Sequence, residues 1–265
     1  MPLVSQEVAM SEVETKTENG VLHIRFNRPE RLNAVNEELY RQTLDALEQA
    51  EQDAGIRCVV LSGNGRAFCA GADLKAHKTG RSREDRESYI RLGNNVCKRI
   101  QTLRVPVVAM VHGYAIGGGA EIATSADFLI IAEDAQLGFP EAAIGTYVGG
   151  GVTYRLPRLI GLRHAANLLL LGHRITGSQC LEIGLATEAP RADRLQERTN
   201  ELVSRITRNA PISMALIKSA LNSDQGQGDV FEKETLDLLA IMETRDWQEG
   251  VDAFAERRAP LFEGR

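Results

Sequence analysis

The sequence predicts an α/β fold in which most of the strands pair in parallel. Short apolar segments such as Cys58–Leu61 and Val107–Val111 have the composition of buried strands, and segments with helical periodicity lie between them. Such alternation is typical of a parallel sheet covered by helices. The length of 265 residues corresponds, at about 150 residues per domain, to one or two domains, and it allows a large core without disulfides or a structural metal.

The first predicted elements are a β-hairpin and a helix. Val13–Thr17 and Val21–Phe26 alternate between polar and apolar residues, and Asn19-Gly20 between them favours a hairpin turn. Asn36 has a side chain that commonly caps a helix. The apolar stripe that follows it predicts a helix ending near Gly55.

The middle of the chain predicts two further helices and two further strands. Apolar residues recur at helical spacing over residues 89–103, and this helix must end before Pro106. The strand Val107–Val111 is followed by a glycine-rich turn and by a helix that begins at Gly118. Phe128–Ile131 is the next buried strand.

The C-terminal part of the sequence shows helical patterns and no further strand signal. We therefore divide the chain into a core of residues 1–190 and a helical C-terminal region of residues 191–265. The core is expected to hold the catalytic site.

Composition and charge exclude several classes of function. Lys and Arg number 31 and Asp and Glu number 36, and this net charge of −5 disfavours nucleic acid as the main partner. The four cysteines form no CxxC pair and the five histidines show no metal-ligand spacing, so no metal site is expected. No apolar stretch approaches the length of a membrane span, and the N-terminus resembles neither a secretory signal nor a transit peptide. We expect a soluble cytoplasmic protein with no membrane partner.

Three segments have compositions that suit a binding or catalytic site. In His112–Glu121, the glycines Gly117–Gly119 lie between a strand and a helix. Open N–H groups and the helix dipole at such a place favour an anion or a developing oxyanion. In Arg66–Lys75, small central residues allow a ligand to approach the backbone closely. Leu137–Glu141 adds an acidic residue, and two carboxyls in apolar surroundings suggest acid–base chemistry.

Each of these segments also has a purely structural interpretation. The glycines would suit a tight strand–helix crossover, the small residues a packed turn, and Glu141 a solvated loop. Cys69 could be a nucleophile, although a packing role fits it better. The chain has no G-x-G-x-x-G, Walker A or G-x-S-x-G motif, so the signatures of dinucleotide binding, a P-loop and an α/β-hydrolase are absent. The residues alone indicate a backbone oxyanion site with acidic side chains.

In their order along the chain, these segments resemble the crotonase family, also called the enoyl-CoA hydratase/isomerase superfamily. Each motif is modest, but the ordered set is highly specific and covers nearly the whole chain. The resemblance is carried by Asn27–Ala34, Ala67–Lys75, Gly113–Glu121, Gly138–Gly145, Gly161–Gly172, Cys180–Leu185 and Gly250–Pro260.

The resemblance implies a fold, an assembly and a ligand. It implies a spiral of ββα units with a C-terminal helical region that trimerises, so we expect a homotrimer or a hexamer built as a dimer of trimers. The implied ligand is an acyl-CoA thioester, with coenzyme A as part of the substrate and no separate cofactor. The two oxyanion N–H groups fall on Ala72 and Gly118, where they would stabilise an enolate.

The family's hydratases use two glutamates, and these fall on Glu121 and Glu141. In a hydratase, one acts as a base on water and the other delivers a proton to the α-carbon. Two close carboxyls tend not to ionise together, so one is expected to hold a proton near neutral pH.

The resemblance also implies contacts to CoA and to the acyl group. Arg257 aligns with a basic residue that, in relatives, reaches a phosphate of CoA bound in a neighbouring subunit, and Arg31 and Lys75 are weaker candidates. After Gly145, where relatives commonly have a hydrophobic-Pro-Gly turn bordering the acyl pocket, this chain has Thr-Tyr-Val-Gly-Gly-Gly over residues 146–151. The other positions expected to contact the substrate are Ala34, Ala70, Asp73, Leu74, Tyr147 and Phe254.

The expected activity is the reversible addition of water across the 2,3 double bond of an acyl-CoA. The nearest alternative is another reaction of the family, either double-bond isomerisation or dehydration of an unusual acyl-CoA, and the two glutamates favour hydration. An alternative of a different class is a non-catalytic acyl-CoA-binding or RNA-binding member. The acidic charge balance and the retained glutamates argue against it.

Overall fold

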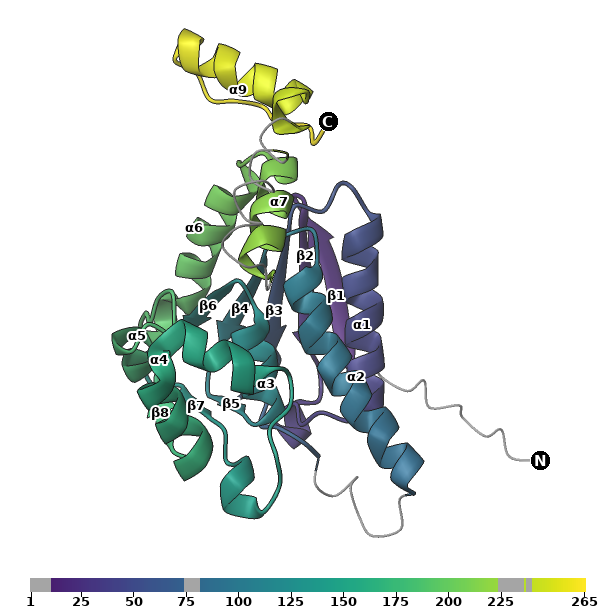
Figure 1. Cartoon of the computed structure of the whole chain (residues 1–265), viewed down its shortest axis with the longest axis vertical. Coiled ribbons are helices and arrows are strands. Elements are labelled where there is room, and N and C mark those ends of the chain that lie inside the picture. The colour runs from purple at the N-terminus through teal and green to yellow at the C-terminus, as the bar shows by residue number, and fades with distance from the viewer. Residues whose placement is uncertain (1–10, 74–81, 224–235, 237–239) are drawn as a thin grey trace, which may run out of the picture.

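A five-stranded sheet forms the centre of the molecule. The computed structural model describes residues 11–73, 82–223, 236 and 240–265 (Figure 1). Across the sheet the order is β1-β2-β3-β4-β6, in which β1 and β2 pair antiparallel and the other neighbours pair in parallel. The expected hairpin and the largely parallel pairing are thereby confirmed. The strands are β1 Val13–Glu18, β2 Val21–Phe26, β3 Cys58–Gly63, β4 Val107–Val111 and β6 Phe128–Ile131.

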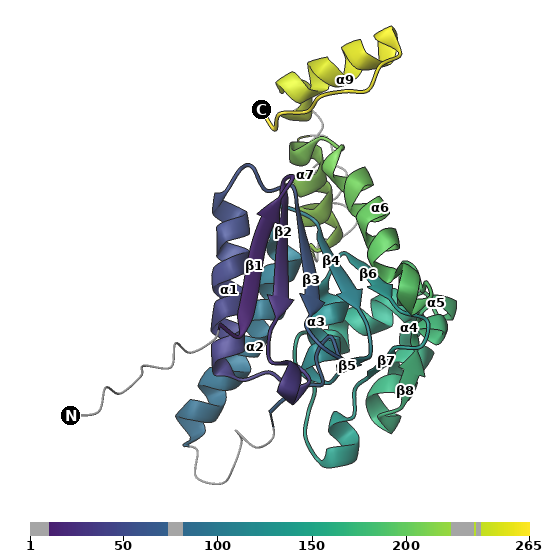
Figure 2. The same ribbon diagram turned by 180° about the vertical axis from the view of Figure 1, so that it is seen from behind.

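Two long helices, α1 and α2, lie side by side across one face of this sheet (Figures 1 and 2). The Asn36 side chain accepts the N–H of Leu39 at 2.8 Å, so it caps α1 as predicted. A reciprocal capping box of Ser82 and Asp85 begins α2, which ends before Pro106 as expected. A short helix, α3, packs against α2 and carries the predicted glycines at its start. The bounds are α1 Glu37–Gln52, α2 Arg83–Thr102 and α3 Gly118–Ser125.

A second, three-stranded sheet was not predicted from the sequence. It has the order β5-β7-β8, with β5 parallel to β7 and β7 antiparallel to β8. The expectation of a plain turn before Gly118 is therefore wrong, because β5 lies within that segment. Each of these strands has three residues, which is too short for a period of two to stand out. They are β5 Tyr114–Ile116, β7 Gln136–Gly138 and β8 Arg174–Thr176.

The remaining elements are helical. A break at Gly161, where φ is 75°, interrupts α4. Helix α6 packs against β3, β4 and β6, and so covers part of the main sheet. The elements are η1 Pro29–Arg31, η2 Glu141–Ile144, α4 Val152–Leu171, α5 Gly177–Glu182, η3 Ala192–Arg194, α6 Leu195–Thr207, α7 Pro211–Leu221 and α9 Arg245–Glu256.

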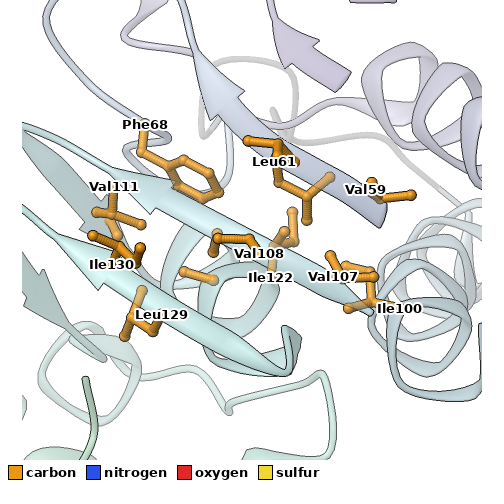
Figure 3. Close-up of a cluster of buried hydrophobic side chains, with 14 of the residues drawn as sticks. Val59, Leu61, Phe68, Ile100, Val107, Val108, Val111, Ile122, Leu129 and Ile130 are labelled. Carbon is orange, nitrogen blue, oxygen red and sulfur yellow. The ribbon is translucent and has the colours of Figure 1, made fainter. Parts of the chain in front are cut away.

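The hydrophobic core lies where β3 and β4 meet α3 (Figure 3). Leu61, Val108 and Ile122 are each at most 1% exposed and meet there, one from each element. Phe68, which is fully buried, packs beside them from the loop that leads toward the glycine-rich turn. Burial of a side chain of this size contributes about 1.5–3 kcal/mol. The core therefore fixes the base of α3, and with it the candidate site.

The C-terminal helices differ in how they join the core. Helix α7 is anchored by Lys218, whose buried ammonium donates to the carbonyl of Ile100 at 2.8 Å and to the Asp127 carboxylate at 2.6 Å. Helix α9 stands beyond α7, at the end of the molecule opposite β5 and η2 (Figures 1 and 2). Its tail touches the core where Arg57 donates to the carbonyl of Phe262 at 3.1 Å. The division at residue 190 stays a prediction.

No helix within the described ranges has both the length and the apolar composition needed to cross a membrane.

Candidate active site

The first turn of α3 presents open backbone N–H groups at the centre of the candidate site. Gly117 precedes the helix with φ 53° and ψ −121°, a conformation that other residues rarely adopt. Its N–H donates to the carbonyl of Gly138 at 2.9 Å. Within the described residues, no acceptor binds the N–H of Gly118. This donor is therefore open at the positive end of the helix dipole.

The second expected donor, Ala72, lies in a segment that pairs with Val35. Val35 donates its N–H to Gly71 at 2.8 Å, and Asp73 donates its N–H to Val35 at 3.0 Å. In such a parallel bridge the N–H of the central residue points away from the partner strand. Ala72 is exposed, and across the described parts of the chain nothing accepts its N–H.

The two donor segments are held together by backbone contacts. Ile116 donates its N–H to the carbonyl of Cys69 at 3.0 Å. A Cβ on Gly119 would lie 2.2 Å from the same carbonyl oxygen, so only glycine fits at this approach. The structure thus brings together the segments that carry Ala72 and Gly118, which the sequence separates by more than forty residues.

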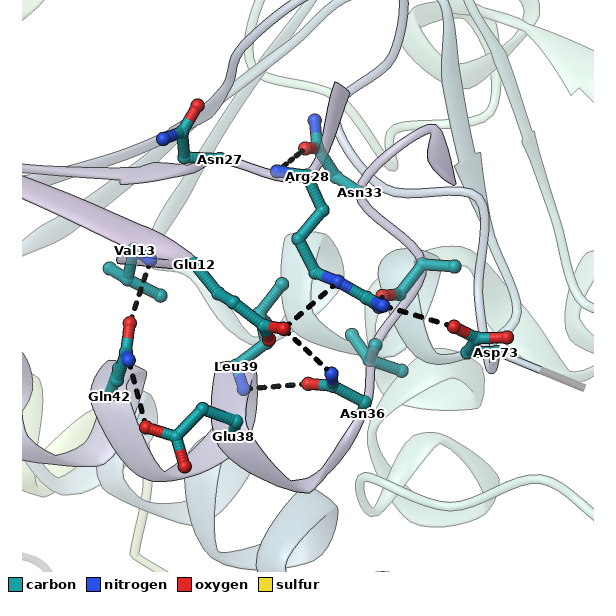
Figure 4. A network of polar contacts seen from close by, with 12 residues as sticks. Glu12, Val13, Asn27, Arg28, Asn33, Asn36, Glu38, Leu39, Gln42 and Asp73 are labelled. Carbon is teal, nitrogen blue, oxygen red and sulfur yellow. Dashed lines mark hydrogen bonds and ion pairs between the residues drawn. The ribbon is translucent and has the colours of Figure 1, made fainter. Parts of the chain in front are cut away.

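A polar cluster around Arg28 fixes the loops on the Ala72 side (Figure 4). The Arg28 guanidinium contacts the Asp73 carboxylate at 3.1 Å and the Glu12 carboxylate at 3.3 Å. Asn33, which is fully buried with φ 56°, accepts the N–H of Arg28 at 2.8 Å and donates to the Ala67 carbonyl at 2.8 Å. These bonds tie the segment that contains Ala72 to the one that follows β2.

Glu121 lies in the first turn of α3 and is held by a backbone donor. Its Oε1 accepts the N–H of Gly149 at 2.6 Å. Burial raises the pKa of Glu121 above its ordinary value, and the Gly149 hydrogen bond and the positive charge of Arg155 offset part of that rise. The charged form of this carboxyl is therefore supported from two sides.

Glu141 begins η2 and has different surroundings. It is 9% exposed, and its buried Oε2 accepts no hydrogen bond from the described residues. Burial raises the pKa of Glu141 to about 7, and the charge of Glu121 adds to the shift. A Cβ on Gly117 would lie 2.6 Å from Glu141 Oε1, so the carboxyl occupies the space that a side chain would need. The alternative of a solvated loop residue is wrong for Glu141.

These contacts bring both predicted carboxyls to the first turn of α3, beside the open N–H of Gly118. The charge of Arg155 acts on Glu121, whereas Oε2 of Glu141 has no hydrogen-bond partner among the described residues, so the proton affinities of the two carboxyls differ. Such a pair can take a proton from one atom and give another proton to a second atom. Among the described residues, no group of three His, Cys, Asp or Glu side chains could hold a metal ion.

The other residues expected to contact the substrate differ in exposure and in their hydrogen bonds. Arg31 is exposed at the end of η1, and Tyr147 is 80% exposed in the loop after η2. The carbonyl of Ala34 accepts from Arg28, and the N–H of Ala70 donates to the backbone of the same loop. Leu74 and Lys75 lie outside the described residues.

Phe254 and Arg257 are not brought to the carboxyls within one chain. Phe254 belongs to α9, and Arg257 follows that helix with φ 56° and an exposed side chain. Helix α9 lies at the far end of the molecule from α3 and η2 (Figures 1 and 2). Their expected role in a neighbouring subunit stays a prediction.

The sequence interpretation did not identify Arg28, Asn94 or Arg155 as parts of the site. Asn94 lies on α2, and its Oδ1 accepts the N–H of Gly150 at 2.8 Å. Arg155 lies on α4 together with Arg158 and Arg163, so no signal in the sequence set it apart. Arg28 offered no local signal for its ion pairs, because the carboxylates of Glu12 and Asp73 lie far from it in the sequence.

Comparison with known proteins identifies relatives along nearly the whole chain. A family model described as enoyl-CoA hydratase/isomerase matches residues 16–265. The 1,2-epoxyphenylacetyl-CoA isomerase of Escherichia coli (strain K12) is 33% identical over 268 residues, covering 97% of this chain and 100% of the relative. The 2,3-dehydroadipyl-CoA hydratase of the same organism is 34% identical over 263 residues, with the same coverage of 97% and 100%.

Solved structures agree with these relatives. The crystal structure of enoyl-CoA hydratase from Bacillus anthracis superposes with a TM-score of 0.92 at 31% sequence identity. The match covers 96% of this chain and 100% of that structure.

Proposed function

Since this chain belongs to the enoyl-CoA hydratase/isomerase family and has the crotonase fold, we propose that it adds water reversibly across the 2,3 double bond of an acyl-CoA thioester. The relatives include a hydratase and an isomerase at nearly equal identity, so the family alone does not choose between these reactions. The observation that carries the proposal is the pair of unlike carboxyls, Glu121 and Glu141, at one helix turn.

In the proposed reaction, the thioester oxygen accepts hydrogen bonds from the N–H groups of Ala72 and Gly118. The support for this is that both donors are open and that their segments pack together. Addition at the 3-carbon pushes negative charge onto that oxygen and forms an enolate. Donors already aimed at the oxyanion stabilise it without reorganisation, and each is worth about 10²–10³ in rate.

The two carboxyls then divide the proton transfers. Glu121, as a carboxylate, takes a proton from water while the water oxygen bonds to the 3-carbon and the double-bond electrons move toward the thioester oxygen. Glu141, as a carboxylic acid, gives its proton to the 2-carbon as the enolate collapses. Exchange with solvent restores both groups. Burial raises the pKa of both carboxyls. The support for this assignment is that the Gly149 hydrogen bond and the charge of Arg155 oppose that shift at Glu121, whereas the charge of Glu121 adds to it at Glu141.

The presence of two functional carboxyls favours hydration over isomerisation. A double-bond shift moves one proton between two carbons, and a single carboxylate can perform it. Hydration needs a base for the water and an acid for the 2-carbon at the same time. A buried acid of raised pKa beside a base that a backbone N–H and a cation stabilise fits the second requirement.

We further propose that CoA binding needs more than one copy of the chain. Arg257 would bind a phosphate of CoA held in the site of a neighbouring subunit, within a homotrimer or a dimer of trimers. The support for this is the position of α9, which is remote from the carboxyls of its own chain.

A panel of 2-enoyl-CoA thioesters of different acyl groups tests the proposed reaction. We expect the conjugated absorbance to fall with at least one of them, and the reaction in H₂¹⁸O to yield a 3-hydroxyacyl-CoA with one ¹⁸O atom. Hydration of no member of the panel would contradict the proposal. Migration of the double bond without ¹⁸O incorporation would instead establish isomerisation.

A further inference from the structure

We infer that Arg155 is a positioning residue for Glu121. Arg155 clamps the turn at residues 149–151 against the end of α3 and supplies the partly buried positive charge that faces the Glu121 carboxylate. This inference rests on the proposed function for its catalytic meaning. It concerns a residue that does not contact the reacting atoms and acts through Glu121.

The clamp is visible in the hydrogen bonds of the guanidinium. Arg155 Nε donates to the carbonyl of Thr124 at 3.0 Å, and Nη2 donates to Ser125 Oγ at 3.0 Å. From the other side, Nη1 donates to the carbonyl of Gly150 at 3.3 Å. One planar fork thus joins the last turn of α3 to the glycine turn, and a lysine would have no such fixed geometry.

The clamped turn is the one that holds Glu121. The N–H of Gly149 donates to Glu121 Oε1, and the next N–H, of Gly150, donates to Asn94 Oδ1 at 2.8 Å. A Cβ on Gly149 would lie 3.0 Å from Asn94 Oδ1 and 3.2 Å from Glu121 Oε2. A side chain at residue 149 would therefore crowd both Asn94 and Glu121, and on the opposite side of the turn Arg155 binds the carbonyl of Gly150. Movement of Arg155 would release the donor that orients Glu121.

The charge argument starts from the absence of a direct ion pair. Within the described ranges, the Arg155 guanidinium bonds to carbonyl and hydroxyl oxygens and forms no ion pair, although a half-buried cation is stabilised by a compensating charge. Burial lowers the pKa of Arg155, and Cys97 and Glu121 oppose that shift. The thiol of Cys97 has a pKa of about 12 and is neutral near pH 7. Glu121 is therefore the charge that balances Arg155.

The other titratable groups facing Glu121 do not replace this balance. Burial raises the pKa of each, so the tyrosine and the two cysteines are neutral near pH 7, and Glu141, whose pKa is about 7, supplies no positive charge. They are Tyr40 on α1, Cys97 on α2, Cys69 before β5 and Glu141 on η2. Arg155 on α4 is the cation that acts on Glu121.

The test separates charge from clamp with two variants and a matched control. Arg155→Gln removes the positive charge, and Arg155→Lys keeps the charge but loses the planar set of guanidinium donors. Arg104→Gln is the control, because Arg104 also binds backbone carbonyls, those of Glu51 at 3.1 Å and Ala50 at 3.0 Å, away from the site. Circular dichroism verifies the fold of each variant.

The first readout is the titration of Glu121 without substrate, followed by ¹³C NMR of labelled glutamate and assigned with Glu121→Gln. We expect Arg155→Gln to raise the pKa of Glu121 by about one unit, as loss of a nearby opposite charge does. Arg155→Lys and Arg104→Gln should leave this pKa in place. An unmoved titration in folded Arg155→Gln would overturn the charge assignment, whether or not the protein hydrates any enoyl-CoA.

The second readout is catalysis and turn mobility. We expect Arg155→Lys to lower kcat about tenfold with little change in KM, and to speed amide hydrogen exchange at Gly149 and Gly150. The acid limb of its pH profile should stay in place, whereas that of Arg155→Gln should move to higher pH. If Arg155→Gln does not fold, Arg155→Lys still tests whether the guanidinium hydrogen bonds hold the turn at residues 149–151. Wild-type kcat and wild-type exchange in that variant would overturn the clamp.

Discussion

The first turn of α3 and the helix α9 contribute to the proposed site in different ways. Around α3, the chain itself supplies both carboxyls, an open N–H at Gly118 and the neighbouring Ala72 segment. Helix α9 carries Arg257 to the opposite end of the molecule, where no part of the acid–base pair lies. Under the proposed function, the acid–base chemistry and the phosphate contact of CoA are therefore assigned to separate regions of the chain. Variants near α3 should change kcat, and variants near α9 should change KM.

The largest expected effects come from the two carboxyls. Glu121→Gln and Glu141→Gln keep the size of the side chain but remove proton transfer, so each should lower kcat by about 10²–10⁴-fold. The double variant should be little worse than either single one, because residues that act as a unit are not additive. Turnover of a 2-enoyl-CoA thioester measures these effects.

A matched control for the carboxyl variants is Glu182→Gln, which changes an exposed glutamate on α5 and should leave kcat in place. If Glu121→Gln remains active while Glu141→Gln does not, a two-carboxyl mechanism is wrong. Isomerisation through one carboxylate would then be the better account.

The next largest effect concerns the open N–H of Gly118. Gly118→Pro deletes this donor at the first position of α3, where proline is tolerated in helices, and should lower kcat by about 10²-fold or more. Gly118→Ala is the matched control, because it keeps the N–H and adds a Cβ 3.1 Å from the Tyr40 hydroxyl. A folded proline variant with the turnover of the alanine variant would exclude Gly118 as an oxyanion donor.

A smaller effect is expected at α9. Arg257→Ala should raise KM by up to about fivefold with little change in kcat, because an exposed ion pair contributes at most about 1 kcal/mol and phosphate binding is equal in ground and transition states. The effect should shrink as salt is added. An unchanged KM at low salt, or a kcat lowered as much as in the carboxyl variants, would break the separation of the two regions.

The smallest expected effect is on stability. The pKa of Glu141 is raised to about 7 in the folded protein, above the value near 4.5 of a free glutamate. The folded state therefore holds the proton more tightly, and stability falls as pH rises from about 4.5 through about 7. Glu141→Gln has no carboxyl to ionise and so does not lose stability in this way. The Tm of this variant minus the Tm of wild type should therefore increase between pH 5 and pH 7.5. A constant difference in Tm would mean that Glu141 is not held neutral by burial.

The sequence predicts most of the central sheet and of the helices because these elements carry strong local signals. Asn36 is followed by a clear apolar stripe, and Pro106 limits α2. The strands β5, β7 and β8 were missed because three residues carry no usable period. Their pairing depends on contacts between segments far apart in the chain, as in the pairing of Tyr114 with Gln136.

The candidate site shows the same contrast between features that local sequence predicts and features that depend on long-range contacts. Open N–H groups at a glycine-rich helix start follow from local sequence, and so does the presence of two acidic residues. The burial of Glu141 against Gly117 does not, since it requires the β5–β7 pairing to bring η2 to α3. The ion pairs of Arg28 and the bonds of Arg155 to Thr124 and Ser125 join distant segments, and no spacing rule predicts them.

The central claim is that Glu141 carries a proton near neutral pH while Glu121 does not. Infrared difference spectra at pH 6 test it directly, because a protonated carboxyl has a C=O stretching band that a carboxylate lacks. Comparison of wild type with Glu141→Gln should show the loss of one such band, and comparison with Glu121→Gln should show the band retained. Loss of the band in Glu121→Gln but not in Glu141→Gln would reverse the roles of the two carboxyls and contradict the mechanism.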